Sequence, residues 1–106
     1  MTVQGSPHSI FARAIEHGNL LVAETTLRVE ITHPTLLDLL ELTALIALKD
    51  PARHSRAAAR WLRRWLDAID DATIEDAALA ASCLQTLGSR HHGSALATLR
   101  RLAEEA

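Results

Sequence analysis

Apolar residues recur every three or four positions along most of this chain, which is the spacing of the buried face of an α-helix. Near the start, Ile10 and Ala14 share one such face. Ser6 before them is a good N-cap, and Gly18 after them is typical of a residue just past a helix end. Residues 25–31 have some β character, but their apolar spacing also fits a helix, which is favoured. The whole pattern predicts six helices, at residues 7–17, 20–31, 36–49, 51–69, 74–87 and from about 89 onward.

Two of the predicted helices begin with the same capping signal. Thr35 is followed three positions later by Asp38, and Thr73 is followed by Asp76 in the same way. Each pair resembles a capping box with aspartate in place of the usual glutamate. Both helices are apolar almost all round, so each must be covered on more than one side. If the other helices cannot cover both, self-association or binding of a partner is expected.

Short connections of about two to five residues join the predicted helices and force neighbours to lie antiparallel. We therefore expect an all-α fold of about six antiparallel helices, arranged as three consecutive αα-hairpins. The second and third hairpins match when the sequence is shifted by 38 positions, which places Thr35 on Thr73. Such hairpins can form a solenoid-like right-handed array or a compact bundle. Residues 1–106 are expected to be a single helical domain, with residues 1–5 a disordered N-terminus.

Three αα-hairpins in tandem resemble the tetratricopeptide and HEAT class of helical repeat proteins. The bend at Gly18 and Asn19, within residues 14–23, is similar to the tight hairpins of that class. The apparent period is longer than a tetratricopeptide repeat, and the tyrosines of that motif are absent. Residues 40–66 also resemble small helical proteins of GC-rich bacteria. The repeat resemblance implies a surface for binding other proteins, and neither resemblance implies particular site residues.

Composition limits the class of protein further. With 106 residues, of which 48% are hydrophobic and 23% charged, the chain can build one core and is too apolar for a disordered segment. Its single cysteine, Cys83, excludes a disulfide framework and a cysteine-based zinc finger. No apolar run reaches the roughly eighteen residues of a membrane span. The N-terminus lacks the features of a signal peptide, so the cytoplasm is the expected location.

Charge is distributed unevenly along the chain. Residues 51–69 carry +4 and the remaining residues −6, which gives the net charge of −2. Five arginines on the predicted fourth helix supply the positive charge and fall within about 100° of arc. These candidate binding residues are Arg53, Arg56, Arg60, Arg63 and Arg64. Guanidinium groups pair with carboxylates and with phosphates, so an acidic protein face or a nucleic acid would fit them. A solvated face, with Arg63 paired to Asp67, explains them without a partner.

Trp61 and Trp65 lie on the opposite side of the same predicted helix. Tryptophan beside arginine is also a feature of helices that lie in a membrane interface. Short turns hold this helix between its neighbours, however, and no membrane partner is expected. Both tryptophans are therefore expected to pack in the core, with each indole N–H donating to a carbonyl or to water.

The sequence indicates no catalytic residues and no metal site. Its histidines form no His-x-x-x-His pair, and His91 and His92 diverge by about 100° on a helix. Only the pairing of hairpins could bring His54 near them. Cys83 is expected to be a buried structural thiol, and helix capping explains the acidic residues within 70–76. No cofactor and no small-molecule substrate are indicated.

These patterns favour a small non-enzymatic module that binds a protein partner or associates with itself. The alternative is a nucleic-acid accessory protein that binds phosphates through the basic face of the fourth helix. Specific reading of bases is poorly supported, because that helix offers arginines and few other polar side chains that contact base edges.

Overall fold

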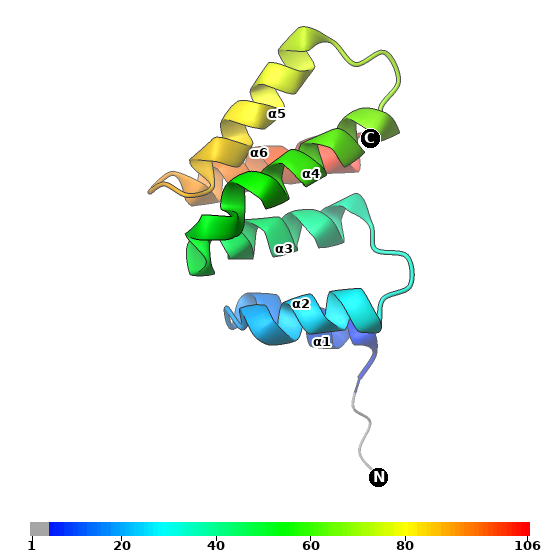
Figure 1. Ribbon diagram of the computed structural model, residues 1–106. Coiled ribbons are helices and arrows are strands. Elements are labelled where there is room, and N and C mark those ends of the chain that lie inside the picture. The colour runs from blue at the N-terminus through cyan, green and yellow to red at the C-terminus, as the bar shows by residue number, and fades with distance from the viewer. Residues whose placement is uncertain (1–4) are drawn as a thin grey trace.

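Six α-helices make up most of residues 5–106, the part of the chain that this computed structural model describes (Figure 1). The elements are α1 (Pro7–Glu16), α2 (Leu20–Val29), α3 (Leu36–Lys49), the 3-10 helix η1 (Pro51–Arg53), α4 (His54–Ala68), α5 (Ile74–Thr86) and α6 (His92–Glu104). No strand occurs among these residues, so the predicted all-α fold is confirmed. Apart from Gly5, the segment expected to be disordered lies outside the described residues.

The starts of α3 and α5 follow the capping signals in the sequence. The Thr35 hydroxyl accepts a hydrogen bond from the Asp38 N–H at 3.1 Å, and the Asp38 carboxylate accepts one from the Thr35 N–H at 3.0 Å. Thr73 and Asp76 form the same reciprocal pair of bonds, each at 3.0 Å. Both capping boxes are therefore confirmed. They satisfy backbone N–H groups that have no partner within the helix.

Two helices begin later than the sequence predicts. Asp50 has a non-helical backbone with φ of −145° and ψ of 70°, and the Arg53 N–H then bonds to the Asp50 carbonyl three residues back. Residues 51–53 therefore form the separate helix η1, and α4 begins at His54. Likewise, Ser89 bonds back to the Thr86 carbonyl in a turn, and α6 begins at His92 rather than near residue 89. The prediction that the fourth helix begins at residue 51 is thus wrong, because its first turn is the separate helix η1.

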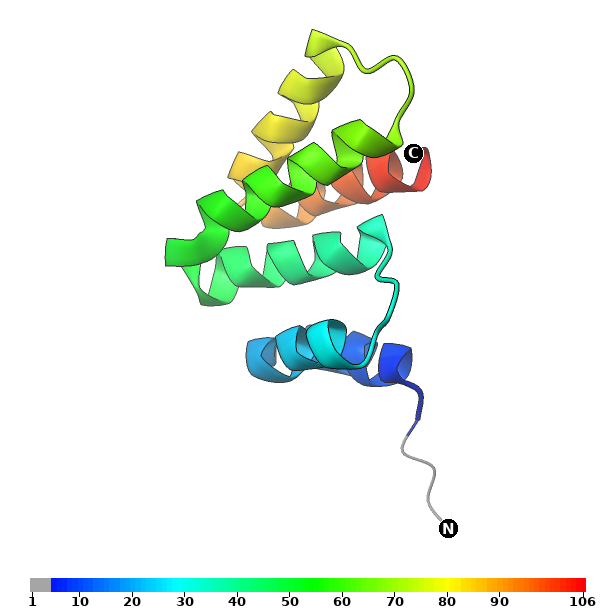
Figure 2. The ribbon, with the colours of Figure 1, turned by 45° about the vertical axis from the view of Figure 1, so that its right-hand side comes forward.

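The last four helices pack as one bundle. Each of α3, α4, α5 and α6 contacts the next, and α6 also contacts α3, so the contacts form a closed ring (Figures 1 and 2). The sequence leaves open a solenoid-like array or a compact bundle, and this ring corresponds to the compact bundle. The helix starts keep the 38-residue offset, since Leu36 and Ile74 begin α3 and α5, and His54 and His92 begin α4 and α6.

Trp61 and Trp65 are the largest side chains of the bundle core, and both are buried. Their rings stack with centroids 6.2 Å apart. The Trp61 indole N–H donates to the Leu36 carbonyl at 2.9 Å, and that of Trp65 donates to the Leu102 carbonyl at 3.1 Å. Their expected place in the core is confirmed. Within residues 5–106, no helix combines the length and the apolar character needed to cross a membrane.

The hairpin of α1 and α2 covers a second side of α3. Its buried residues Phe11, Leu27 and Ile31 form a second core with Leu45 of α3. Leu40, on another side of α3, packs into the bundle core. α3 is therefore covered on two sides, as its almost wholly apolar sequence requires.

α5, by contrast, is covered on one side only. Ala80 and Leu84 are buried against the bundle, but Ile74 is 86% and Leu79 47% exposed. The expectation that both apolar helices are covered therefore holds for α3 and fails for the outer face of α5.

We predict that Leu40→Ala lowers the free energy of unfolding by about 2–5 kcal/mol, because it leaves a cavity where α3 meets the bundle core. Leu79→Ala, which removes the same atoms from the exposed face of α5, should cost less than about 0.5 kcal/mol. Unfolding by urea, followed by circular dichroism, measures both values. Equal losses in the two variants would contradict the assignment of the core.

Candidate functional site

Four of the five candidate arginines lie on one exposed face of α4. Arg56, Arg60, Arg63 and Arg64 are exposed, and within residues 5–106 no carboxylate lies within 4.0 Å of their guanidinium groups. They line an open hollow of about 520 Å³. The expected pair of Arg63 with Asp67 is therefore not formed. This face carries a concentration of positive charge that the described part of the chain leaves unpaired.

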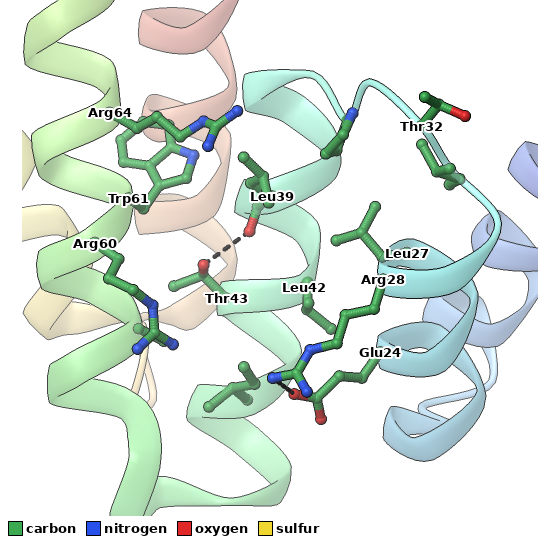
Figure 3. Close-up of a pocket in the computed structure, with 14 residues that line it drawn as sticks. Glu24, Leu27, Arg28, Thr32, Leu39, Leu42, Thr43, Arg60, Trp61 and Arg64 are labelled. Carbon is green, nitrogen blue, oxygen red and sulfur yellow. Dashed lines mark hydrogen bonds and ion pairs between the residues drawn. The ribbon is translucent and has the colours of Figure 1, made fainter.

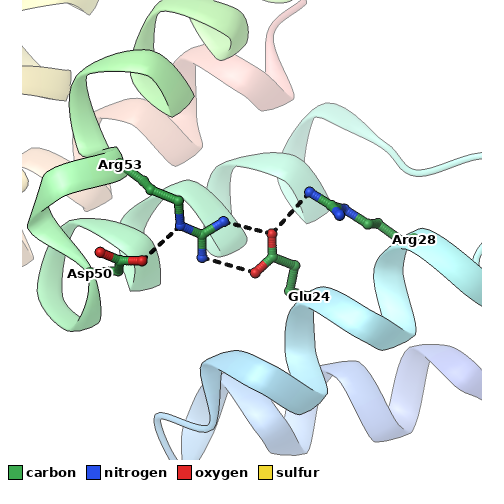
Figure 4. Close-up of polar contacts among 4 residues, drawn as sticks. All are labelled: Glu24, Arg28, Asp50 and Arg53. Atoms are coloured by element: carbon green, nitrogen blue, oxygen red, sulfur yellow. Dashed lines mark hydrogen bonds and ion pairs between the residues drawn. The ribbon is translucent and has the colours of Figure 1, made fainter.

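Arg53, the fifth candidate, is placed differently. Its Nε donates to Asp50 at 2.8 Å, and its two terminal nitrogens donate to both carboxylate oxygens of Glu24, at 2.8 and 2.9 Å (Figure 4). Arg28, one turn along α2, approaches the same carboxylate at 3.2 Å. Because Arg53 lies in η1 and is paired with Glu24 and Asp50, the prediction that all five arginines lie on the fourth helix is wrong at this residue.

These contacts make an ionic clasp, formed by Glu24, Arg28, Asp50 and Arg53, that joins α2 to η1 (Figure 4). Hydrogen bonds from Arg53 are the main reason that the pKa of Glu24 lies below the ordinary value for glutamate. The same bonds, together with that to Asp50, raise the pKa of Arg53. Both groups are therefore charged at neutral pH, and the bidentate geometry fixes the distance between the two elements.

A groove runs beside the clasp, with α3 as its floor and α2 and α4 as its walls (Figure 3). Its volume is about 480 Å³. Leu39 and Leu42 lie half-buried on the floor. The only hydroxyl on the floor, that of Thr43, already donates to the Leu39 carbonyl at 2.7 Å. The floor therefore presents mainly apolar surface to an occupant.

The rim of the groove is positively charged. Arg60 and Arg64 extend from α4 and Arg28 from α2 (Figure 3). Arg60 is close enough to Glu24 for its charge to help lower the pKa of that carboxyl. Glu24 is shared by Arg53, Arg28 and, at longer range, Arg60, so it offsets only part of the positive charge at the rim. An apolar floor between arginine walls suits a ligand that has both apolar and acidic groups.

The sequence pointed to Arg60 and Arg64 on the α4 wall of this groove. It did not point to the other lining residues that matter here, which are Glu24, Arg28, Leu39 and Leu42. The Arg53–Glu24 pair joins positions 29 apart in the chain, which no helical spacing brings together. Leu39 and Leu42 read as ordinary positions of an apolar helix. The only available signal was the strongly apolar character of α3, which required more cover than one hairpin supplies.

His54 and His92 each form a hydrogen bond to a carbonyl group at the C-terminal end of α5. His54 Nε2 donates to the Leu84 carbonyl at 2.8 Å, and His92 Nδ1 donates to the Leu87 carbonyl at 2.6 Å. Carbonyl groups in the last turn of a helix lack partners within it, so these bonds satisfy them. His91 is exposed. In the part of the chain that is described, no group of three His, Cys, Asp or Glu side chains is placed to bind a metal.

Neither Cys83 nor the acidic residues near the start of α5 line the groove. The expectation that Cys83 is buried is wrong, because the residue is only partly buried. This partial burial raises the pKa of its thiol, which is therefore protonated at neutral pH. Asp76 caps α5. Asp71 has a positive φ of 55°, a conformation that aspartate tolerates in turns. The placements of Asp76 and Asp71 agree with structural roles in the cap of α5 and in the turn before it.

We predict that Glu24→Gln destabilises the protein at neutral pH and that the loss disappears in acid. A carboxyl whose pKa is lowered by folding contributes its stabilisation above its ordinary pKa of 4.5. That contribution is lost as the pH falls through the lowered value in the folded state. Urea unfolding of wild type and variant over this range measures the difference.

Glu30→Gln is the matched control for this measurement, because Glu30 is exposed and makes no ion pair among the described residues. It should follow wild type at every pH. Equal pH dependence of the Glu24 and Glu30 variants would show that the clasp contributes no stability.

Comparison with known proteins finds no relative of this chain. No family model, no curated protein and no solved structure matches the chain. The resemblance to tetratricopeptide and HEAT proteins therefore stays a prediction. The groove and the arginine face of α4 are therefore defined by their own geometry.

Proposed function

We propose that this chain is a small non-enzymatic protein-interaction module, and that its groove between α2 and α4 receives a partner segment with apolar and acidic side chains. The main support is the combination of an apolar floor at Leu39 and Leu42 with the unpaired Arg60 and Arg64 beside it. Grooves of this kind bind amphipathic helices through a few apolar anchors. Arginine is also enriched among the residues that dominate binding energy at protein interfaces.

The volume and form of the groove support the same conclusion. At about 480 Å³ it falls within the usual range of binding sites, but it is an open channel between helices rather than an enclosed pocket. The proposal assigns no catalytic residue, metal, cofactor or small-molecule substrate. It places the module in the cytoplasm, where a free thiol such as that of Cys83 is usual.

We predict that the double variant Arg60→Glu, Arg64→Glu loses a bound partner that the wild-type chain retains from native lysate. Reversing both charges places carboxylates beside the acidic groups of the partner, which opposes binding. Both side chains are exposed, so the variant should fold normally. Mass spectrometry of the captured proteins, with circular dichroism of the bait, measures the outcome.

The matched control is Arg56→Glu, Arg63→Glu, which makes the same change of charge on the same helix. These two arginines line the hollow on the outer face of α4 but not the groove. The control should keep the partner. Loss of the partner from both variants, or from neither, would contradict binding in the groove.

The outer face of α4 supports a second candidate function, which is nucleic-acid binding. Arg56, Arg60, Arg63 and Arg64 line one hollow and are free to contact successive phosphates. Phosphate contacts alone would bind without regard to sequence, as an accessory protein does. This function requires Arg56 and Arg63, whereas binding in the groove does not.

If this second function holds, affinity for duplex DNA should fall with salt, with a logarithmic slope of about −3.6 for four neutralised phosphates. The Arg56→Glu, Arg63→Glu variant should roughly halve that slope. Arg13→Glu, Arg90→Glu, with exposed arginines outside α4, serves as the control. A titration at low salt in which the α4 variant binds as well as wild type would rule out this function.

A further inference from the structure

In the described part of the chain, five large apolar residues are 47% exposed or more. They are Leu21, Val29, Leu48, Ile74 and Leu79. Leu21 and Val29 lie on α2 with Arg28 beside them, and Leu48 precedes Lys49. Each of these three thus has a basic residue on its own helix. Ile74 and Leu79 lie on α5, which carries Glu75 and Asp76 and no basic residue.

The outer face of α5 combines apolar and acidic groups. At helical spacing, Ile74, Ala78 and Leu79 fall on one exposed arc, and Glu75 lies between them. Asp71 lies in the turn just before the helix and is exposed as well. Within residues 5–106, no cation lies within 4.0 Å of the carboxylates of Glu75 and Asp71. This face is therefore apolar, negatively charged and without a partner in the molecule.

The groove between α2 and α4 has the complementary chemistry. Its floor is apolar at Leu39 and Leu42, and its α4 wall carries the unpaired Arg60 and Arg64. Ile74 and Leu79 could rest on that floor while Glu75 faces the arginine wall. The exposed face of α2 offers no such match, because Arg28 would meet Arg60 and Arg64 with like charge.

The two surfaces cannot meet within one molecule. α5 packs on α4 and α6, while the groove lies on the other side of α4, toward α2 (Figures 1 and 2). We infer that the outer face of α5 of one copy docks into the groove between α2 and α4 of a second copy. This inference rests on the proposed function, since it uses the same groove as the receptor.

Such a contact joins two different surfaces, so the first copy keeps its groove free and the second copy keeps its α5 face free. A contact of this type is heterologous and continues from copy to copy, closing into a ring or extending as an open chain. Association is therefore expected to proceed beyond dimers as protein concentration rises. Another partner of the groove should resemble α5, as a helix with two apolar anchors and an acidic first turn.

Sedimentation velocity on the full chain, over about a hundredfold range of concentration, tests this inference. Wild type should show mass rising with concentration. The groove variant Arg60→Glu, Arg64→Glu and the α5 variant Glu75→Arg should each weaken association at least about tenfold, because each brings like charges together. Arg56→Glu, Arg63→Glu should associate as wild type does. Circular dichroism checks that every variant is folded.

Mixing the groove variant with the α5 variant separates docking from a general loss of structure. In the mixture each reversed groove meets a reversed α5, and each native groove meets a native α5. Association should therefore return to within about threefold of wild type. A variant that merely misfolds would not be restored by mixing.

Two results would overturn the inference. One is a wild-type chain that stays monomeric at every concentration, and the other is association that neither variant weakens. If the wild type is monomeric while the captured partner still depends on Arg60 and Arg64, only the self-docking fails. If that partner is indifferent to both arginines, the proposed function of the groove fails as well.

Discussion

The apolar surface of α3 is the constraint on which the rest of this fold depends. A helix that is apolar almost all round cannot leave any long side facing water without losing stabilisation. Leu40 buries one side in the bundle of α3 to α6, and Leu45 buries another against the hairpin of α1 and α2. Both halves of the protein are therefore organised around this one helix, and neither has a complete core without it.

The groove is a consequence of the same arrangement. α2 and α4 pack against different sides of α3, and between them a strip with Leu39 and Leu42 is left only half-covered. The pair of Glu24 with Arg53 links α2 to η1, directly before α4, and so fixes the distance between the two walls at that end. The candidate site thus arises where two cores meet, which is a usual place for a binding site.

The sequence predicted those parts of the structure that depend on short-range patterns. Both capping boxes, the six helices and the double covering of α3 follow from spacing and residue type over a few turns. Arg53 shows where this reasoning stops. Its place depends on the non-helical backbone of Asp50 and on Glu24, 29 positions away, and neither follows from helical periodicity. The groove could not be predicted either, because it depends on how two separate hairpins are oriented on α3.

The stacked indoles of Trp61 and Trp65 give the two halves of the protein different optical properties. They are the only tryptophans in the chain, and both lie in the core shared by α3 to α6. Their intrinsic fluorescence therefore reports on that half alone, whereas the peptide absorption bands report on every helix. If the α1–α2 hairpin detaches before the bundle melts, the two signals separate, and their coincidence is a direct measure of how cooperatively the halves are coupled.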